Sequence, residues 1–76
     1  MEEKLKETMS RLFKIDVDSI TDKMTMQDVE RWDSLKHLEF VMKLEEVFDI
    51  AFETEEIIEL VSVEEIKKTL IKKGVS

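Results

Sequence analysis

The strongest constraint in this chain of 76 residues is an unbroken helical segment, residues 33–50, that is apolar on too many sides. The segment contains no Gly or Pro, and its Leu, Met, Lys and Glu residues favour a helix. At about 100° per residue, its apolar side chains cover roughly 240° of the helix circumference. A surface helix needs an apolar stripe of only about 100° to face a core. The segment therefore predicts a helix with one core face and a second apolar face that the core does not need.

The two faces carry different residues. The predicted core face holds Phe40, Val41, Leu44, Val47 and Phe48. The second face, which we call the docking stripe, consists of Leu35, Leu38 and Met42 with Glu45 among them, flanked by Glu39 and Glu46. The small polar pair Asp33 and Ser34 marks the expected helix start. We therefore expect an apolar docking stripe with a serine hydroxyl at its N-terminal end.

The rest of the chain predicts an all-α fold, a small four-helix bundle of three longer helices and one short helix, formed by residues 1–76 as a single domain. A first helix, residues 2–14, is indicated by the single-face spacing of Leu5, Met9, Leu12 and Phe13. Residues 15–32 lose this periodicity and predict a long loop before the second helix, with a helical turn near residues 25–30.

Two further helices follow the central one. Thr54 is expected to cap the short third helix, whose inward side chains are predicted to be Ile57, Ile58 and Leu60. Ser62 and Glu65 have the spacing of a capping box that opens the fourth helix. Its expected inner stripe is Val63, Ile66, Leu70 and Ile71.

Composition excludes several classes of function. The chain has no Cys, which excludes a disulfide framework, a thiolate zinc site and a cysteine nucleophile. No apolar run approaches the roughly 18 residues needed to span a bilayer, so we expect a soluble, cytoplasmic protein without membrane insertion. The net charge of −7 argues against binding to nucleic acid.

The acidic residues are concentrated in the middle of the chain. Residues 15–59 hold fourteen acidic and four basic side chains, whereas the two ends together hold five acidic and eight basic ones. This distribution indicates partners with basic surfaces, because long-range attraction raises encounter rates. The alternative is that these charges only keep the domain soluble.

An enzyme is not expected. His37 is the only histidine, and it falls near the core-side edge of the central helix. Ser34 and His37 are three residues apart, so a hydrogen bond is possible, but no oxyanion loop or Gly-rich elbow accompanies them. We predict a structural or surface histidine. No metal site is predicted either, because the pair Asp16 and Asp18 lacks the Gly and the Glu that a calcium loop requires.

Ser34 is the residue with the most suitable chemistry. At a helix N-terminus its hydroxyl lies beside free backbone N–H groups and the positive end of the helix dipole, which suits a phosphate. The residue type and position alone leave open a plain helix cap that is never modified.

The motif around Ser34 resembles the phosphopantetheine attachment region of acyl carrier proteins. The resemblance rests on Asp33-Ser34-Leu35, Glu39, Glu45-Glu46 and Phe48-Asp49-Ile50, and it extends to the helix pattern of the whole chain. The form Trp32-Asp33-Ser34-Leu35, followed by His37-Leu38-Glu39, is especially similar to carriers of specialised pathways. Arg31 and Trp32 stand where small residues are common in the housekeeping members.

The resemblance implies a cofactor, 4'-phosphopantetheine, transferred from coenzyme A to Ser34 by a phosphopantetheinyl transferase. The protein becomes a phosphoprotein whose arm brings the thiol that the chain lacks. Asp33 and Leu35 are then part of the cofactor site. The resemblance also implies that partner enzymes contact a set of six residues: Leu35, Leu38, Glu39, Met42, Glu45 and Glu46.

The expected function is to carry acyl chains as thioesters between enzymes of fatty-acid, polyketide or related biosynthesis, as a monomer. The expected partners are acyl-transferring, condensing or acyl-activating enzymes with basic docking surfaces. The alternatives are an aminoacyl or peptidyl carrier, or an unmodified helical module for protein binding. As a hypothesis, a cavity could receive the acyl chain between Phe40, Leu44, Phe48, Leu60 and Val61.

Overall fold

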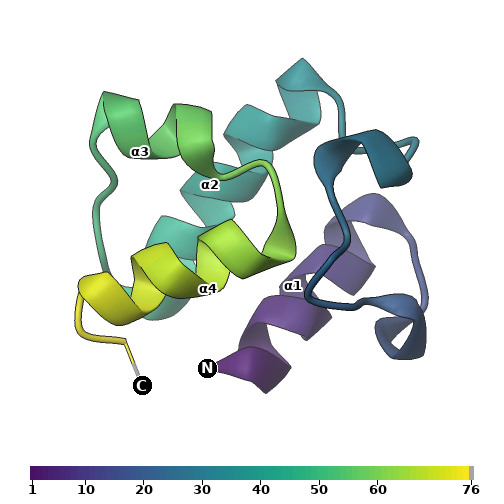
Figure 1. The fold of residues 1–76 in the computed structure, drawn as a ribbon, viewed down its shortest axis with the longest axis horizontal. Helices are drawn as coiled ribbons and strands as arrows, with labels where there is room; N and C mark the ends of the chain where they lie inside the picture. Colours follow the sequence, from purple (N-terminus) through teal and green to yellow (C-terminus); the bar gives the residue numbers. More distant parts are fainter. Residues whose placement is uncertain (76) are drawn as a thin grey trace.

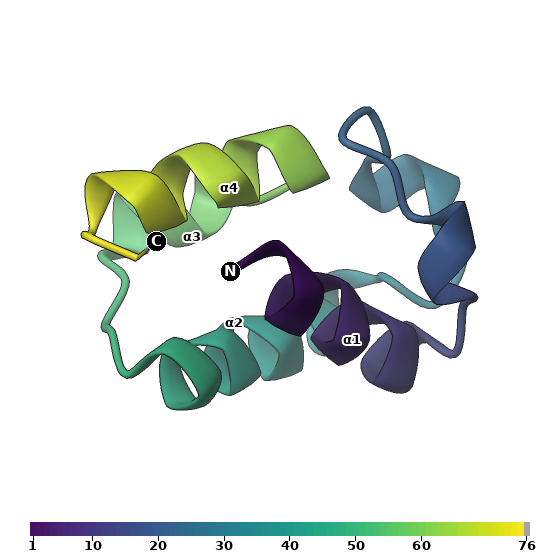
Figure 2. The ribbon, with the colours of Figure 1, turned by 90° about the horizontal axis from the view of Figure 1, so that it is seen from below.

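The computed structural model describes residues 1–75 as four α-helices joined by a long loop and short turns. In chain order the elements are α1 (Glu2–Phe13), the 3-10 turns η1 (Val17–Ser19) and η2 (Met26–Asp28), α2 (Ser34–Phe48), α3 (Thr54–Glu59) and α4 (Val63–Lys72). Helices α1 and α2 lie in one layer and α3 and α4 in a second, with the long loop along one end of the molecule (Figures 1 and 2). The predicted all-α bundle is confirmed. The predicted turn near residues 25–30 is η2.

An aromatic cluster fills the core between α1 and α2. Phe13 stacks on Trp32 with 5.2 Å between ring centroids and meets Phe40 edge-on at 5.1 Å. Trp32 meets Phe40 edge-on at 5.6 Å and is only 1% exposed. The expectation of an irregular loop up to Trp32 therefore missed a core residue, because a loop side chain has no periodicity that reveals its burial.

The helix ends differ in part from the expected caps. Asp33 is the N-cap of α2, with its Oδ1 accepting the backbone N–H of Lys36 at 2.8 Å, so Ser34 is the first helical residue rather than the cap. Glu53, not Thr54, caps α3, and its backbone N–H donates to the Glu56 side chain at 2.8 Å. The predicted cap of α4 is confirmed: Ser62 Oγ accepts the N–H of Glu65 at 3.2 Å.

Some predicted inner faces are narrower than expected. Ile58 is 71% exposed and Ile71 is 61% exposed, although both were expected to face inward. Consecutive residues of a helix point about 100° apart, so burial of their neighbours turns these two side chains towards solvent. Val47 and Phe48 are half-buried rather than fully buried.

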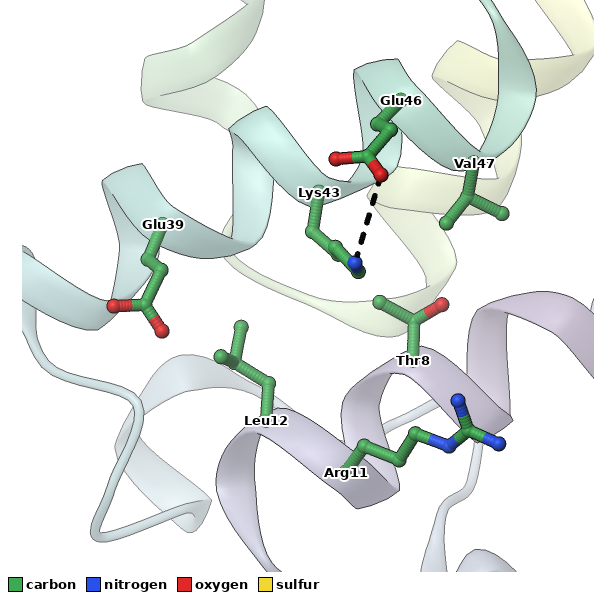
Figure 3. A pocket seen from close by; sticks show the side chains of 7 residues that line it. All are labelled: Thr8, Arg11, Leu12, Glu39, Lys43, Glu46 and Val47. Carbon is green, nitrogen blue, oxygen red and sulfur yellow. Dashed lines mark ion pairs between the residues drawn. The ribbon is translucent and has the colours of Figure 1, made fainter.

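A surface groove runs between α1 and α2 (Figure 3). Thr8, Arg11 and Leu12 line it from α1, and Glu39, Lys43, Glu46 and Val47 line it from α2. Lys43 Nζ lies 3.8 Å from a Glu46 oxygen, so charges of both signs face this groove. Glu39 and Glu46, the acidic residues that flank the docking stripe, therefore lie on one side of this groove, and α1 forms the other side.

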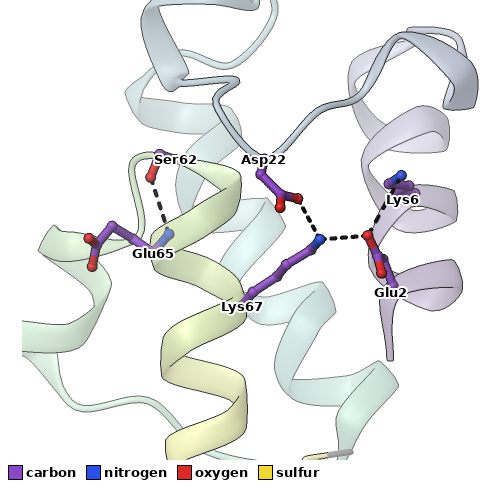
Figure 4. Close-up of polar contacts among 6 residues, drawn as sticks. All are labelled: Glu2, Lys6, Asp22, Ser62, Glu65 and Lys67. Carbon is purple, nitrogen blue, oxygen red and sulfur yellow. Dashed lines mark hydrogen bonds and ion pairs between the residues drawn. The ribbon is translucent and has the colours of Figure 1, made fainter.

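Lys67 connects three parts of the chain that are distant in sequence (Figure 4). Its Nζ lies 2.6 Å from Glu2 Oε1 on α1 and 2.5 Å from Asp22 Oδ1 in the long loop. The hydrogen bond and the charge of Lys67 lower the pKa of both carboxyls, and the two carboxylates raise the pKa of Lys67. This contact joins the long loop and α1 to α4.

We expect the Lys67→Met variant to lose part of the acid sensitivity of folding. A carboxyl whose pKa is lowered by folding stabilises the protein above its unfolded value, here 4.5 for Glu2 and 3.8 for Asp22, and that stabilisation disappears as pH falls through the lowered values. The stability difference between the two proteins should therefore be constant near neutral pH and shrink below about pH 4. Urea denaturation across this range measures it, and a difference that does not change in acid contradicts the assignment.

Within residues 1–75, none of the helices combines the length and apolar character needed to cross a membrane. The same part of the chain brings together no group of three or more His, Cys, Asp or Glu side chains suited to a metal ion.

Candidate attachment and docking site

Ser34 lies at the exposed N-terminal end of α2. The side chain of Asp33 satisfies the N–H of Lys36, while His37 N donates to the Asp33 carbonyl at 2.8 Å. These bonds leave the N–H groups of the first turn, at Ser34 and Leu35, without a partner within the helix, as at any helix start. An anion on the Ser34 oxygen meets these donors and the positive end of the helix dipole. The exposed Ser34 hydroxyl and the backbone N–H groups beside it are thus suited to a phosphodiester.

The buried side chains of Trp32 and His37 hold the turn at Asp33 and Ser34 on its core side. Trp32 Nε1–H donates to His37 Nδ1 at 2.9 Å, and His37 Nε2 lies 2.9 Å from the carbonyl oxygen of Ile57 on α3. Because Nδ1 accepts, a neutral ring carries its proton on Nε2 and donates it to that carbonyl. His37 is 9% exposed, as expected for a structural histidine. It therefore joins the residue before the Asp33–Ser34 turn to α3.

The apolar part of the docking stripe is exposed on α2. Leu35 is 77%, Leu38 56% and Met42 68% exposed. Their spacings of three and four residues place them on one helix face, and Ser34 is four residues before Leu38 on the same face. The structure thus brings the serine and these three apolar residues together in one row. Ile58 on α3 and Val61 after it are further exposed apolar residues, 71% and 42% respectively.

The acidic residues of the docking stripe are partly engaged within the chain. Glu39 Oε2 lies 3.2 Å from Lys36 Nζ, and Glu46 Oε1 lies 3.8 Å from Lys43 Nζ. Glu45 is half-buried, and its carboxylate accepts the backbone N–H of Phe52 at 2.9 Å. The stripe is therefore less negative than the row of glutamates indicates, and Glu45 also holds the turn into α3.

Sequence reasoning missed two features of this region. The exposure of Ile58 could have been inferred, because Ile57 and Ile58 are adjacent and cannot both point to the same side of a short helix. The bridge from Trp32 through His37 to Ile57 has no sequence signal, because a loop, a helix and a carbonyl 20 residues further along meet only in the folded chain.

The comparison with known families shows which family the chain belongs to. The family described as "Phosphopantetheine attachment site" matches residues 3–70. The chain belongs to this phosphopantetheine-binding family. The family match establishes phosphopantetheine as the cofactor and a carrier domain, rather than an enzyme, as the kind of protein. A phosphopantetheinyl transferase and the enzymes of a pathway are therefore its partners in general.

A solved structure supports the same fold. It is described as that of a candidate acyl carrier protein from Mycobacterium tuberculosis, and it superimposes with a TM-score of 0.84 at 26% sequence identity. The alignment covers 95% of this chain and 96% of that one, so this phosphopantetheine-binding chain has the same fold over nearly its whole length. No curated protein matches the sequence.

Proposed function

We propose that the protein is an acyl carrier protein, a single domain with its phosphopantetheine arm on Ser34. The observation that carries the proposal is the exposed Ser34 in the first turn of α2, at the head of an exposed apolar row. A docking protein can cover the row and the hydroxyl together, which suits a residue that a transferase must reach. Asp33 supports the role by fixing the helix start with its 2.8 Å bond to Lys36 N.

Attachment transfers the phosphopantetheinyl group of coenzyme A to the serine oxygen. The Ser34 Oγ–P bond forms, the pyrophosphate P–O bond of coenzyme A breaks, and adenosine 3',5'-bisphosphate leaves. The serine proton passes to a base of the transferase, because the nearest titratable ring, His37, has both nitrogens engaged by Trp32 and Ile57. When bound, the arm supplies a thiol that holds the cargo as a thioester. The free N–H groups of the first turn hold the phosphodiester charge.

The docking stripe suits short-lived contacts with partner enzymes. Leu35, Leu38 and Met42 offer apolar contact area, and Glu39, Glu45 and Glu46 offer a modest negative charge that orients a basic partner. The internal pairs with Lys36 and Lys43 weaken that charge. Specificity should therefore depend more on the apolar contacts than on the glutamates. A small interface of this kind releases its partner readily.

An acyl cargo is favoured over an aminoacyl or peptidyl cargo by two observations. The segment of residues 15–59 is strongly acidic, with fourteen acidic and four basic residues. The M. tuberculosis structure that shares the fold is described as that of a candidate acyl carrier protein. Enzymes of fatty-acid, polyketide or related pathways are the proposed partners, and loading by adenylating enzymes for amino acids would favour the peptidyl alternative.

The attachment residue can be tested by intact mass. We expect incubation with coenzyme A and a broad-specificity phosphopantetheinyl transferase to add one phosphopantetheine to the wild-type protein and none to Ser34→Ala. Ser62→Ala is a matched control, because it removes the N-cap serine of another helix and should still be loaded. Equal loading of Ser34→Ala and wild type contradicts Ser34 as the site. A folded, unmodified wild-type protein that accepts no arm contradicts the carrier function.

A further inference from the structure

The core next to the attachment residue is filled by an aromatic side chain. Only Asp33 separates Trp32 from Ser34, so the Cα atoms of Trp32 and Ser34 lie within about 8 Å of each other. The Trp32 indole is 1% exposed and is held between Phe13 and Phe40 by the ring contacts described above. Closely packed rings therefore occupy this part of the core.

A surface groove lies over this tryptophan. Its lining residues are Thr25, Met26, Gln27, Trp32 and Val61. Trp32 lines the groove but is almost fully buried, so we take it as the floor, while Met26 and the partly exposed Val61 are apolar residues of the walls. Met26 N donates to the Val61 carbonyl at 2.8 Å, which ties the two walls together. A chain that enters this groove meets the indole before it reaches the core.

The floor is fixed in place by His37. The indole N–H of Trp32 donates a hydrogen bond to His37 Nδ1 at 2.9 Å. The second ring nitrogen of His37, Nε2, is hydrogen-bonded to the Ile57 carbonyl on α3, also at 2.9 Å. Moving the indole aside, or parting α2 from α3, breaks a hydrogen bond of a side chain that is 9% exposed. Unsatisfied polar groups in such surroundings are costly. Three of the five residues expected to line a cargo cavity are likewise packed: Phe40, Leu44 and Leu60 have 0% exposure.

We propose that Trp32 limits the part of an acyl cargo that this carrier can shelter to its first few carbons. The groove over Trp32 holds the first carbons of an acyl group when the flexible arm folds back, and any longer chain stays in solvent. The inference rests on the proposed function of Ser34 as the attachment residue. It replaces the hypothesis of a cargo cavity between Phe40, Leu44 and Phe48, and it makes Trp32 a residue that determines specificity.

A series of chain lengths tests this inference in the wild-type protein. Acetyl, octanoyl and dodecanoyl arms are loaded from the corresponding coenzyme A thioesters, with intact mass as proof of loading. Thioester cleavage by hydroxylamine is then compared with that of the free acyl-pantetheine. Because Trp32 is the only tryptophan, its indole N–H gives one resonance to follow by NMR. We expect the ratio of the cleavage rate on the protein to that of the free counterpart to be the same for all three chain lengths, with the indole resonance unmoved between octanoyl and dodecanoyl forms. Protection of the dodecanoyl thioester together with a shifted indole resonance overturns the proposal.

Substitutions of Trp32 test whether removing the indole lets a long acyl chain enter the protein. Trp32→Ala and the milder Trp32→Leu deepen the groove, so the dodecanoyl thioester should become about tenfold slower to cleave, as expected for a chain that is inside for about nine-tenths of the time. Trp32→Phe keeps most of the floor and should remain unprotected. Leu5→Ala is the matched control, because it opens space at a fully buried residue that does not line the groove. If folded Trp32→Leu gives no protection, Trp32 is not the limit.

Failure of the attachment itself is recognised separately. If the mass shows no loading of Ser34, the proposed function fails, whereas the limit set by Trp32 can still be measured. The chain has no Cys, so Ser34→Cys offers a single thiol for alkylation with maleimides that bear short or long alkyl chains. An indole resonance that moves with long but not with short alkyl chains overturns the inference, and one that is insensitive to chain length supports it.

Discussion

Replacing Phe40 by alanine is expected to destabilise the domain by about 3–5 kcal/mol, the usual cost of removing a fully buried aromatic ring. Phe40 has 0% exposure and meets both Phe13 and Trp32 edge-on, at 5.1 and 5.6 Å, so its loss removes contacts from the centre of the core. A chain of 76 residues has a total stability of about 4–11 kcal/mol at the usual 0.05–0.15 kcal/mol per residue. The variant should therefore lose a large share of its stability, and all of it if the wild type lies at the lower end of this range.

Urea denaturation followed by circular dichroism measures this effect, with Phe48→Ala as the matched control. Phe48 is the same residue type on the same helix, but it is only half-buried at the end of α2. Its replacement should cost about 1–2 kcal/mol, because part of the ring already contacts water. Equal losses for the two variants would mean that the C-terminal end of α2 is as well packed as its middle.

The second large effect is expected at the docking stripe. Met42→Glu should lower kcat/KM of the phosphopantetheinyl transferase about tenfold to a hundredfold, which corresponds to about 1.4–2.8 kcal/mol. Met42 is 68% exposed in the row that begins at Ser34, so a charge there meets the apolar surface of the docked enzyme. Burial of an unpaired carboxylate in that contact opposes binding.

Ile71→Glu is the control for this prediction. Ile71 is 61% exposed on α4, outside the docking stripe, and the change introduces the same charge. Both variants should keep the melting temperature of the wild type, because neither residue is in the core. If the two changes lower kcat/KM equally, the effect comes from net charge and not from the stripe. If Met42→Glu leaves kcat/KM unchanged, Met42 does not contact the transferase.

The two faces of α2 differ in what they contact. One face of α2 is exposed and apolar, as the proposed docking requires, and the opposite face is held by Phe40, Val41 and Leu44. The turn that bears Ser34 is fixed from outside by the Asp33 cap and from inside by the pair of Trp32 and His37. A partner can thus contact the serine without the core having to open.

Local patterns in the sequence determined the helices, the second apolar face of α2 and the position of Ser34. These features depend on spacing within one helix, which the 3.6-residue period fixes before any packing occurs. The exposure of Leu35, Leu38 and Met42 followed the same period and is confirmed. The caps were less certain, because Asp33 and Ser34, like Glu53 and Thr54, are neighbours and backbone geometry decides which one lies outside the helix.

Only the tertiary structure decided the features that depend on contacts distant in sequence. Trp32 is buried because α1 supplies Phe13 and α2 supplies Phe40, and no local pattern of the loop contains that information. His37 gains its second partner from α3, and Glu45 is drawn to the backbone of Phe52 instead of facing a partner freely. The sequence thus specified where the arm is expected to attach, while packing across the bundle closed the core beneath it, because burial depends on neighbours that the fold alone brings together.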